Sequence, residues 1–190
     1  MDLNLVIDRF QSDHDTLEIN DIEYISSAVL LPLVIYSNKL CILLQIRSET
    51  LNHHPGEIGF PGGAREKIDS NFIDTMYRET KEEIGLNKNN IKIIGKLDDV
   101  ITSTSFLIKP YVGIIKKPTD YKLSSEVKKI INVPVSDLNN PINWRYDYII
   151  HKKCLIKLKT FYYDGNIVFG ATAKILNNFF NIINLQKSSI

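Results

Sequence analysis

Three glutamates in a short acidic segment are the side chains of this sequence whose types and spacing could do chemistry. Glu82 and Glu83 follow Glu79 by three and four positions, so on a helix the three carboxylates would fall within one arc of roughly 100°. Like charges placed in this way repel each other. Hard divalent cations such as Mg²⁺ or Mn²⁺, which prefer oxygen ligands, would offset that repulsion. The alternative interpretation is a solvated acidic face at the end of a helix.

A turn-rich loop upstream of these acids could form the second component of a site for phosphate and metal. It contains four glycines, Gly56, Gly59, Gly62 and Gly63. Such a loop lets the backbone approach a ligand closely. Downstream of the acids, Gly85 is typical of a helix C-cap. The acids would therefore lie in the last turns of a helix, where its dipole disfavours them, and this favours a functional site over a solvated face.

The segment RETKEEIGL, which begins at Arg78, resembles the second half of the Nudix box, the signature of Nudix hydrolases. The box reads Gly, five residues, Glu, seven residues, then Arg-Glu-apolar-x-Glu-Glu-x-Gly-apolar. Gly63 lies fifteen positions before Arg78, one more than the general box allows. No glutamate stands where the first box glutamate should be, so Asp69 or Glu66 must serve there, or nothing does. The extra residue, together with GFPGG, resembles the coenzyme A pyrophosphatase branch.

That branch has a further motif before the box: Leu-Leu-x-x-Arg-Ser, three residues, Arg, three residues, Gly, three residues, Phe-Pro-Gly-Gly. Here the segment from Leu43 to Gly63 reads LLQIRSETLNHHPGEIGFPGG, with every spacing kept and Asn52 in place of the second arginine. An arginine there could hold the 3'-phosphate of coenzyme A bidentately, whereas asparagine offers a neutral amide. Coenzyme A hydrolysis with weak discrimination against the dephospho form is therefore expected.

The resemblance implies roles for individual residues. Glu79, Glu82 and Glu83 would bind the metal, together with a carbonyl of Gly62 or Gly63, and Glu79 could also act as the base. Arg78 would orient a carboxylate by a charge-assisted hydrogen bond, or would only balance surface charge. The positions expected at the substrate are Arg47, Ser48, Asn52, Gly56, Phe60 and Gly62.

Several of these assignments have a second interpretation. Arg47 and Ser48 could contact a substrate phosphate or only anchor the loop. Glu126 is a candidate catalytic residue, because a glutamate from this region supplies a base or a further ligand in several Nudix enzymes; from its neighbours alone it is a surface acid. His53 and His54 are expected to line the ligand or to be structural, since hard metals prefer carboxylates.

Apolar strands must position this site. Residues 27–37 and 40–46 predict two buried strands joined by a turn. The remaining strands are expected over residues 91–100, 101–115, 144–150 and 154–163, with another after Glu126. A helical N-terminal extension, residues 1–24, would pack on a hydrolase domain at 25–190. Strands alternating with two principal helices imply an α/β fold with a mixed sheet between helices, which the resemblance makes a Nudix-type α/β/α sandwich.

The helix that carries the acids is expected from Ser70 to Ile84. Asp69 or Ser70 would cap its N-terminus. Ile73, Tyr77 and Ile84 form an apolar stripe, so the helix should pack with its carboxylates at the edge of a cleft.

The composition of the chain limits the classes of binding partner that can be expected. A chain of 190 residues suits one domain with a sizeable core. Its net charge of +1 gives no electrostatic field that would attract nucleic acid. The sequence contains no apolar run of 18 residues, so no membrane span is predicted. Cys41 and Cys154 are expected as two buried thiols of a reduced, cytoplasmic protein, with a single disulfide as the alternative.

These observations together predict a hydrolase that uses Mg²⁺ or Mn²⁺ to cleave a small-molecule diphosphate. The resemblance implies coenzyme A or an acyl derivative, cut to phosphopantetheine and adenosine 3',5'-bisphosphate. The alternatives are a Nudix hydrolase of another nucleoside diphosphate derivative (a nucleotide, ADP-ribose or a dinucleotide) and a non-catalytic ligand-binding Nudix module. A homodimer is left open.

Overall fold

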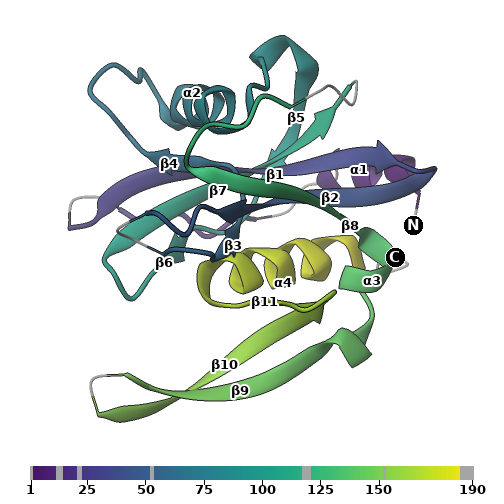
Figure 1. Ribbon diagram of the computed structural model, residues 1–190. Helices are drawn as coiled ribbons and strands as arrows, with labels where there is room; N and C mark the ends of the chain where they lie inside the picture. The colour runs from purple at the N-terminus through teal and green to yellow at the C-terminus, as the bar shows by residue number, and fades with distance from the viewer. Residues whose placement is uncertain are drawn as a thin grey trace.

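The computed structural model describes residues 2–11, 15–20, 23–51, 54–116, 121–151 and 153–184. A large sheet carries helices on both faces, and a small sheet projects from this body (Figure 1). The strands of the large sheet are β1 (Ile25–Tyr36), β2 (Lys39–Arg47), β3 (Ile58–Gly59), β4 (Gly62–Ala64), β5 (Ile91–Lys96), β6 (Val100–Ile101), β7 (Phe106–Ile115) and β8 (Val127–Pro134). Those of the small sheet are β9 (Trp144–His151), β10 (Cys154–Tyr163) and β11 (Asn166–Val168). The helices are α1 (Leu3–Gln11), α2 (Phe72–Ile84), α3 (Val135–Leu138) and α4 (Gly170–Asn184), with 3₁₀ turns η1 (Lys88–Asn90) and η2 (Pro141–Asn143).

The large sheet follows the order β3-β2-β1-β7-β5, with β4 paired to β1, β6 to β7 and β8 to β2. Its β1 and β7 run parallel and its other pairs antiparallel, so the sheet is mixed. The turn between β1 and β2 places Ser37 and Asn38 at φ values of 48° and 60°, as a two-residue hairpin loop of this hand requires. The two buried strands predicted over residues 27–37 and 40–46 are confirmed.

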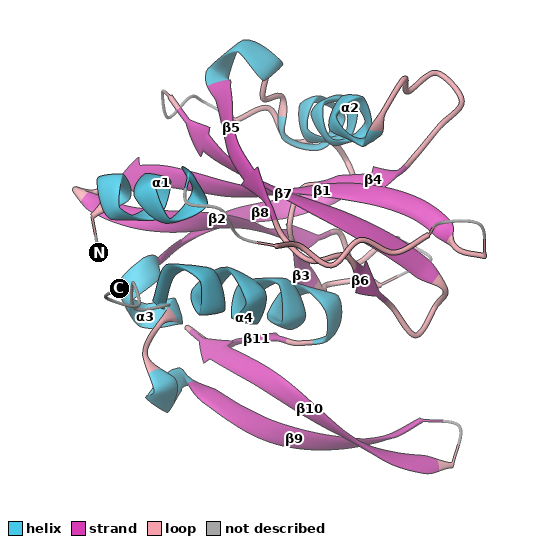
Figure 2. Ribbon diagram, turned by 180° about the vertical axis from the view of Figure 1, so that it is seen from behind, coloured by secondary structure: helices cyan, strands magenta, loops and turns pink. Residues whose placement is uncertain are grey.

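Alternate side chains of the central strands enter two separate cores. On β1, Leu31 and Leu33 pack in the core that includes α1 and α4, whereas Ala28 and Leu30 pack in the core beneath α2. A strand buried on both faces requires this period of two. Figures 1 and 2 show the helices on opposite sides of the sheet, which confirms the predicted α/β/α sandwich.

The first helix, α1, contributes to the core on the α4 side. Val6 and Phe10 are its buried residues, and the Phe10 ring stacks on Phe179 of α4 with 5.8 Å between the ring centroids. The division of the chain at residue 24 stays a prediction. Among the described residues, no helix combines the length and the apolar character needed to cross a bilayer.

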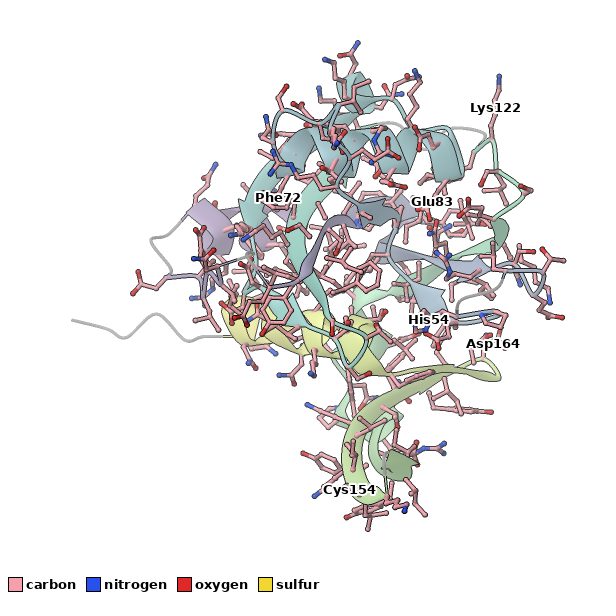
Figure 3. All side chains as sticks on the ribbon, turned by 90° about the vertical axis from the view of Figure 1, so that its left-hand side faces the viewer. His54, Phe72, Glu83, Lys122, Cys154 and Asp164 are labelled. Carbon is pink, nitrogen blue, oxygen red and sulfur yellow. The ribbon has the colours of Figure 1, made fainter. Side chains whose placement is uncertain are left out.

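The two cysteines differ in their surroundings. Cys41 is buried on β2, Cys154 is exposed at the start of β10, and both are free thiols. The prediction of two buried thiols is therefore wrong for Cys154. The reason is that the β9–β10 hairpin leaves the body of the molecule, so no other element that the structure describes packs over Cys154 (Figures 2 and 3).

Helix α2 begins later than its sequence suggested. Its N-cap is Asn71, whose side chain accepts a hydrogen bond from the Asp74 N–H at 2.9 Å. The helix therefore starts slightly after its approximate predicted start, and the predicted caps, residues 69 and 70, are wrong. The helix ends as expected at Gly85, which is left-handed with φ 73°. Ile73 is exposed, because the buried side of the helix is centred on Met76 and Glu83 and the first turn lies at its margin.

Candidate active site

The most buried of the three acids is Glu83, with 5% of its side chain exposed. Its Oε2 accepts a hydrogen bond from the Gly62 N–H at 2.8 Å, and its Oε1 lies 3.7 Å from Arg47 Nη1. Burial raises the pKa of Glu83 to about 7, although the Gly62 N–H and the Gln45 side chain favour the charged form. This carboxylate is therefore held by a backbone donor and two polar side chains from β2.

Glu79 lies one helical turn earlier, against the next glycine of the loop. A Cβ atom at Gly63 would stand 2.5 Å from Glu79 Cδ, so only glycine lets the backbone come this close to the carboxylate. Burial raises the pKa of Glu79, and the charges of Glu82 and Glu126 raise it further, whereas Arg78 lowers it. Two consecutive loop glycines thus each meet one acid of α2, so the loop and the helix form one site.

Arg78 ties the remaining acid into the same arc. Its Nη1 donates to Glu79 Oε1 at 2.9 Å and to Glu82 Oε2 at 3.1 Å. Its Nη2 donates to the Ala64 carbonyl at 2.9 Å. Glu82 is the outermost of the three acids, with 58% of its side chain exposed. The guanidinium therefore sets the directions of two carboxylates by charge-assisted hydrogen bonds.

Asp69 anchors Arg78 from the other side. Arg78 Nε and Nη2 donate to its two oxygens, each at 3.0 Å, and the Thr75 hydroxyl and the Glu66 N–H donate to the same carboxylate. The hydrogen bonds from Arg78 hold the pKa of Asp69 at about 2, well below its usual range. Glu66 is exposed and its carboxylate lies 3.8 Å from Arg78. Of the two substitutes for the first box glutamate, Asp69 is the one that makes the bidentate contact.

A second arginine borders the arc on the other side. Arg47 ends β2, and its Nη2 lies 4.0 Å from Glu126 Oε2 while its Nη1 faces Glu83. Glu126 reaches this position because the Ser124 N–H donates to the Glu83 carbonyl at 2.9 Å and the Ser48 N–H donates to the Glu126 carbonyl at 2.7 Å. The fold thus brings residues 47, 48 and 126 together at the end of α2.

Other residues named from the sequence lie elsewhere. Phe60 is buried in the core on the α4 side of the sheet, away from the acids. His54 Nδ1 lies 2.9 Å from Glu57 Oε1, and Figure 3 shows His54 well apart from Glu83. Gly56 occupies the loop with φ +71°. Asn52 and His53 fall outside the described residues.

Gln45 is a residue of this site that the sequence analysis missed. It lies on β2, is 1% exposed, and its side chain donates to Glu83. Its Oε1 has no hydrogen-bond partner within the described part of the chain. The available signal was a single polar residue in the apolar strand LCILLQI, since a buried amide needs a partner.

The donor set of this site fits a hard divalent cation. It consists of carboxylates and the backbone of a glycine loop, which are the oxygen ligands that Mg²⁺ and Mn²⁺ prefer, and burial raises the pKa of both Glu79 and Glu83. Within the described ranges, no three His, Cys, Asp or Glu side chains are already arranged around one metal position. Glu82 is directed at Arg78, so its side chain would have to turn to join its neighbours.

Comparison with known proteins decides the family. The family model of the NUDIX domain matches residues 27–151, more than half of the chain. The chain belongs to the Nudix family. As a Nudix hydrolase it acts on a diphosphate bond, as predicted. The uncharacterized Nudix hydrolase NudL of Photorhabdus laumondii subsp. laumondii is 32% identical over 154 residues, which cover 80% of this chain and 81% of that protein.

A mammalian relative supports the resemblance to the coenzyme A branch. The mouse peroxisomal coenzyme A diphosphatase NUDT7 is 31% identical over 115 residues, or 60% of this Nudix chain and 49% of the mouse protein.

Solved structures agree on the fold alone. An Ap4A hydrolase of C. elegans has a TM-score of 0.50 at 20% identity over 60% of this chain and 82% of its own. A MutT/nudix family protein of Enterococcus faecalis has a TM-score of 0.54 at 14% identity over 95% of this chain and 69% of its own.

Proposed function

We propose that this Nudix hydrolase cleaves the diphosphate of coenzyme A or its acyl derivatives, in a reaction that depends on Mg²⁺ or Mn²⁺. The products would be phosphopantetheine and adenosine 3',5'-bisphosphate. The observation that carries the proposal is the position of Arg47, the first arginine of the branch motif, at the edge of the acid arc between Glu83 and Glu126. The name of the mouse relative supports the same substrate.

The three acids of α2 would hold the metal. Bound there, Mg²⁺ or Mn²⁺ would neutralise the diphosphate and stabilise charge on the leaving oxygen. Arg78 orients Glu79 and Glu82 through its two hydrogen bonds, and Glu82 would turn from Arg78 toward the metal when the metal binds. The position of the loop glycines against Glu79 and Glu83 supports a further role for the backbone of Gly62 and Gly63 in holding metal or diphosphate.

Arg47 is the residue we assign to a substrate phosphate. Its contacts with Glu83 and Glu126 are 3.7 and 4.0 Å long, and 29% of its side chain is exposed. A guanidinium held so loosely keeps donors for the bidentate geometry that phosphate favours. Ser48, the next residue, would then keep the loop in place.

The water molecule needs a base, and two carboxylates are candidates. Glu126 stands at the rim with 56% of its side chain exposed, where it can exchange protons with solvent. Glu79 is closer to the loop, and burial raises its pKa toward the range of an effective base. The pH dependence of the rate distinguishes the two, as set out in the Discussion.

A substrate panel with Mg²⁺ and with Mn²⁺ tests the proposal. We expect coenzyme A to be cleaved to phosphopantetheine and adenosine 3',5'-bisphosphate, identified by mass, with a higher kcat/KM than ADP-ribose or NADH. Activity that needs no divalent cation, or a preference for ADP-ribose or NADH, would contradict it. The cytoplasmic location expected from the sequence stays a prediction, and the mouse relative is peroxisomal by name.

Asn52 adds a finer expectation about the 3'-phosphate. A charged hydrogen bond contributes roughly 1.5–3 kcal/mol, so lack of the branch arginine should weaken the preference for coenzyme A over its dephospho form by about ten- to a hundredfold. Asn52→Arg should restore that preference. If the native chain already prefers coenzyme A by more than about a hundredfold and the arginine adds nothing, the argument from Asn52 fails.

A further inference from the structure

The β9–β10 hairpin lies apart from the acid site. Figures 1 and 2 show it projecting from the body, below α4 and β11. Its base is buried: Phe161 is fully covered, and the Trp144 ring packs on it with 5.4 Å between centroids. Farther along the hairpin, at Ile150 and Leu155, no other part of the described chain covers it, and two strands on their own are marginal in water.

Large apolar side chains are exposed along this hairpin. On the side that carries Trp144, alternate residues of β9 are increasingly open: Tyr146 is 58% exposed, Tyr148 60% and Ile150 80%. Leu155, which pairs with Ile150 across the hairpin, is 69% exposed. Lys157 and Lys159 of β10 share this face, with Lys157 Nζ 3.9 Å from the Tyr146 ring centroid and Lys159 Nζ 4.8 Å from that of Trp144. Large exposed aromatic and aliphatic side chains between them indicate a contact with another molecule.

Among the described strands, none pairs with the outer edge of the hairpin. β9 is the last strand in the order β11-β10-β9, and its register with β10 runs from Trp144 to His151 without a shift. Natural sheets protect such edges with bulges, prolines or rows of charge. Among its described side chains, β9 carries two charges of opposite sign, Arg145 and Asp147. Within one chain Arg145 Nε donates to Asp147 Oδ2 at 3.1 Å, and the Thr160 hydroxyl donates to the same oxygen at 2.8 Å.

We propose that β9 pairs antiparallel with β9 of a second copy of this chain, about a two-fold axis at Tyr146. Residues equidistant from that axis then face each other, because a two-fold interface is made of the same surface twice. Arg145 faces Asp147 of the second copy, and Asp147 faces its Arg145. Both charge pairs are opposite in sign, which is the arrangement that favours cross-strand pairs.

The same axis matches the apolar residues. Tyr146 meets its own copy, and Trp144 at the base of one hairpin meets Tyr148 near the tip of the other. Ile142, in the turn before β9, is 83% exposed and lies on the side of Ile150 of the second copy, a residue that is 80% exposed. An axis at Tyr148 would instead place Asp147 opposite Ile149. Charge complementarity therefore selects both the partner, a second copy, and the register.

Size-exclusion chromatography with light scattering of the full chain tests the pairing. We expect a particle of twice the 21.8 kDa chain mass. Arg145→Asp and Asp147→Arg should each weaken dimerisation at least about tenfold, since each places like charges opposite each other twice. An equimolar mixture of the two variants should dimerise again, because each strand then faces the opposite charge. A native chain that is monomeric at every concentration overturns the proposal, as does a mixture that stays monomeric.

Cross-linking tests the register separately. In a Cys154→Ser background, Tyr146→Cys should form a disulfide-linked dimer with a mild oxidant, since the two copies of this residue meet on the axis. Tyr148→Cys, which would face Trp144, should not. A dimer that cross-links through position 148 and not 146 overturns the axis. Salt-dependent binding of single-stranded RNA by a monomeric native chain would assign the surface to nucleic acid and also overturn the proposal. None of these residues lies at the acid arc, so coenzyme A hydrolysis reports independently on the active site.

Discussion

Two arginines flank the acid arc and are held in opposite ways. Arg78 is saturated: five hydrogen bonds of 2.9–3.1 Å join it to Asp69, Glu79, Glu82 and the Ala64 carbonyl. Arg47 makes two looser contacts, at 3.7 and 4.0 Å, with Glu83 and Glu126. A guanidinium with all donors used can only position its partners, whereas one with spare donors can bind a ligand. The difference supports a framework role for Arg78 and the proposed substrate role for Arg47.

The acids between the two arginines should give the largest effect. Glu83→Gln and Glu82→Gln should each lower kcat by at least ~10²-fold with the fold intact, because each removes a charged oxygen where charge stabilisation dominates. Glu49→Gln is a matched control, since Glu49 pairs with Lys128 at the surface. Steady-state kinetics at saturating Mg²⁺ measures this. Full activity in either acid variant would mean that the arc is only a solvated face.

Asp69→Asn tests the framework role of Arg78. It leaves a largely buried guanidinium without its bidentate partner, which should cost about 3 kcal/mol of folding free energy. The folded pKa of Asp69, about 2, is below its ordinary value of 3.8. The stabilisation is therefore complete above about pH 4 and is lost as the pH falls through about 2.

Urea unfolding of the native chain and of Asp69→Asn over a pH series measures this loss. The difference in unfolding free energy should shrink between about pH 4 and pH 2. A difference that is constant over this range would show that the Asp69 charge does not anchor Arg78.

Arg47→Ala tests whether Arg47 acts on the substrate, in contrast to Arg78. We expect kcat/KM to fall about ten- to a hundredfold, as loss of a charged hydrogen bond to phosphate implies, with little change in unfolding free energy. Lys128→Ala removes one exposed positive charge of β8 and serves as the control. Loss of stability as large as that of Asp69→Asn, with unchanged kinetics, would place Arg47 in the framework and not at the substrate.

Glu126→Gln should give the smallest effect. Metal affinity should be nearly unchanged, because Glu126 lies outside the helix arc. If Glu126 is the base, its loss should change the pH dependence of the rate. Comparison of the two pH–rate profiles measures this, and superimposable profiles with equal rates would leave Glu79 as the remaining candidate.

Features with a local cause were predictable from the sequence. The helical period places Glu79, Glu82 and Glu83 on one arc, Gly85 ends the helix, and the apolar runs form β1 and β2. The N-cap was missed because residues 69–71 are all good caps, and the hydrogen bond to the Asp74 N–H is made by Asn71. Local propensity alone could not choose among three neighbours.

Contacts between distant segments depended on the tertiary structure. Asp69 makes the bidentate hydrogen bond with Arg78 because it is buried beside Thr75, while Glu66 faces solvent and lies 3.8 Å from the guanidinium. Gln45 reaches Glu83 only because the fold brings the Gln45 side chain of β2 to the end of α2. The sequence by itself determined the acid arc, the glycine loop and the strands, since spacing and turn residues act within a few positions. Which partner holds each acid, and that Cys154 stays exposed on an uncovered hairpin, was decided by packing between segments far apart in the chain.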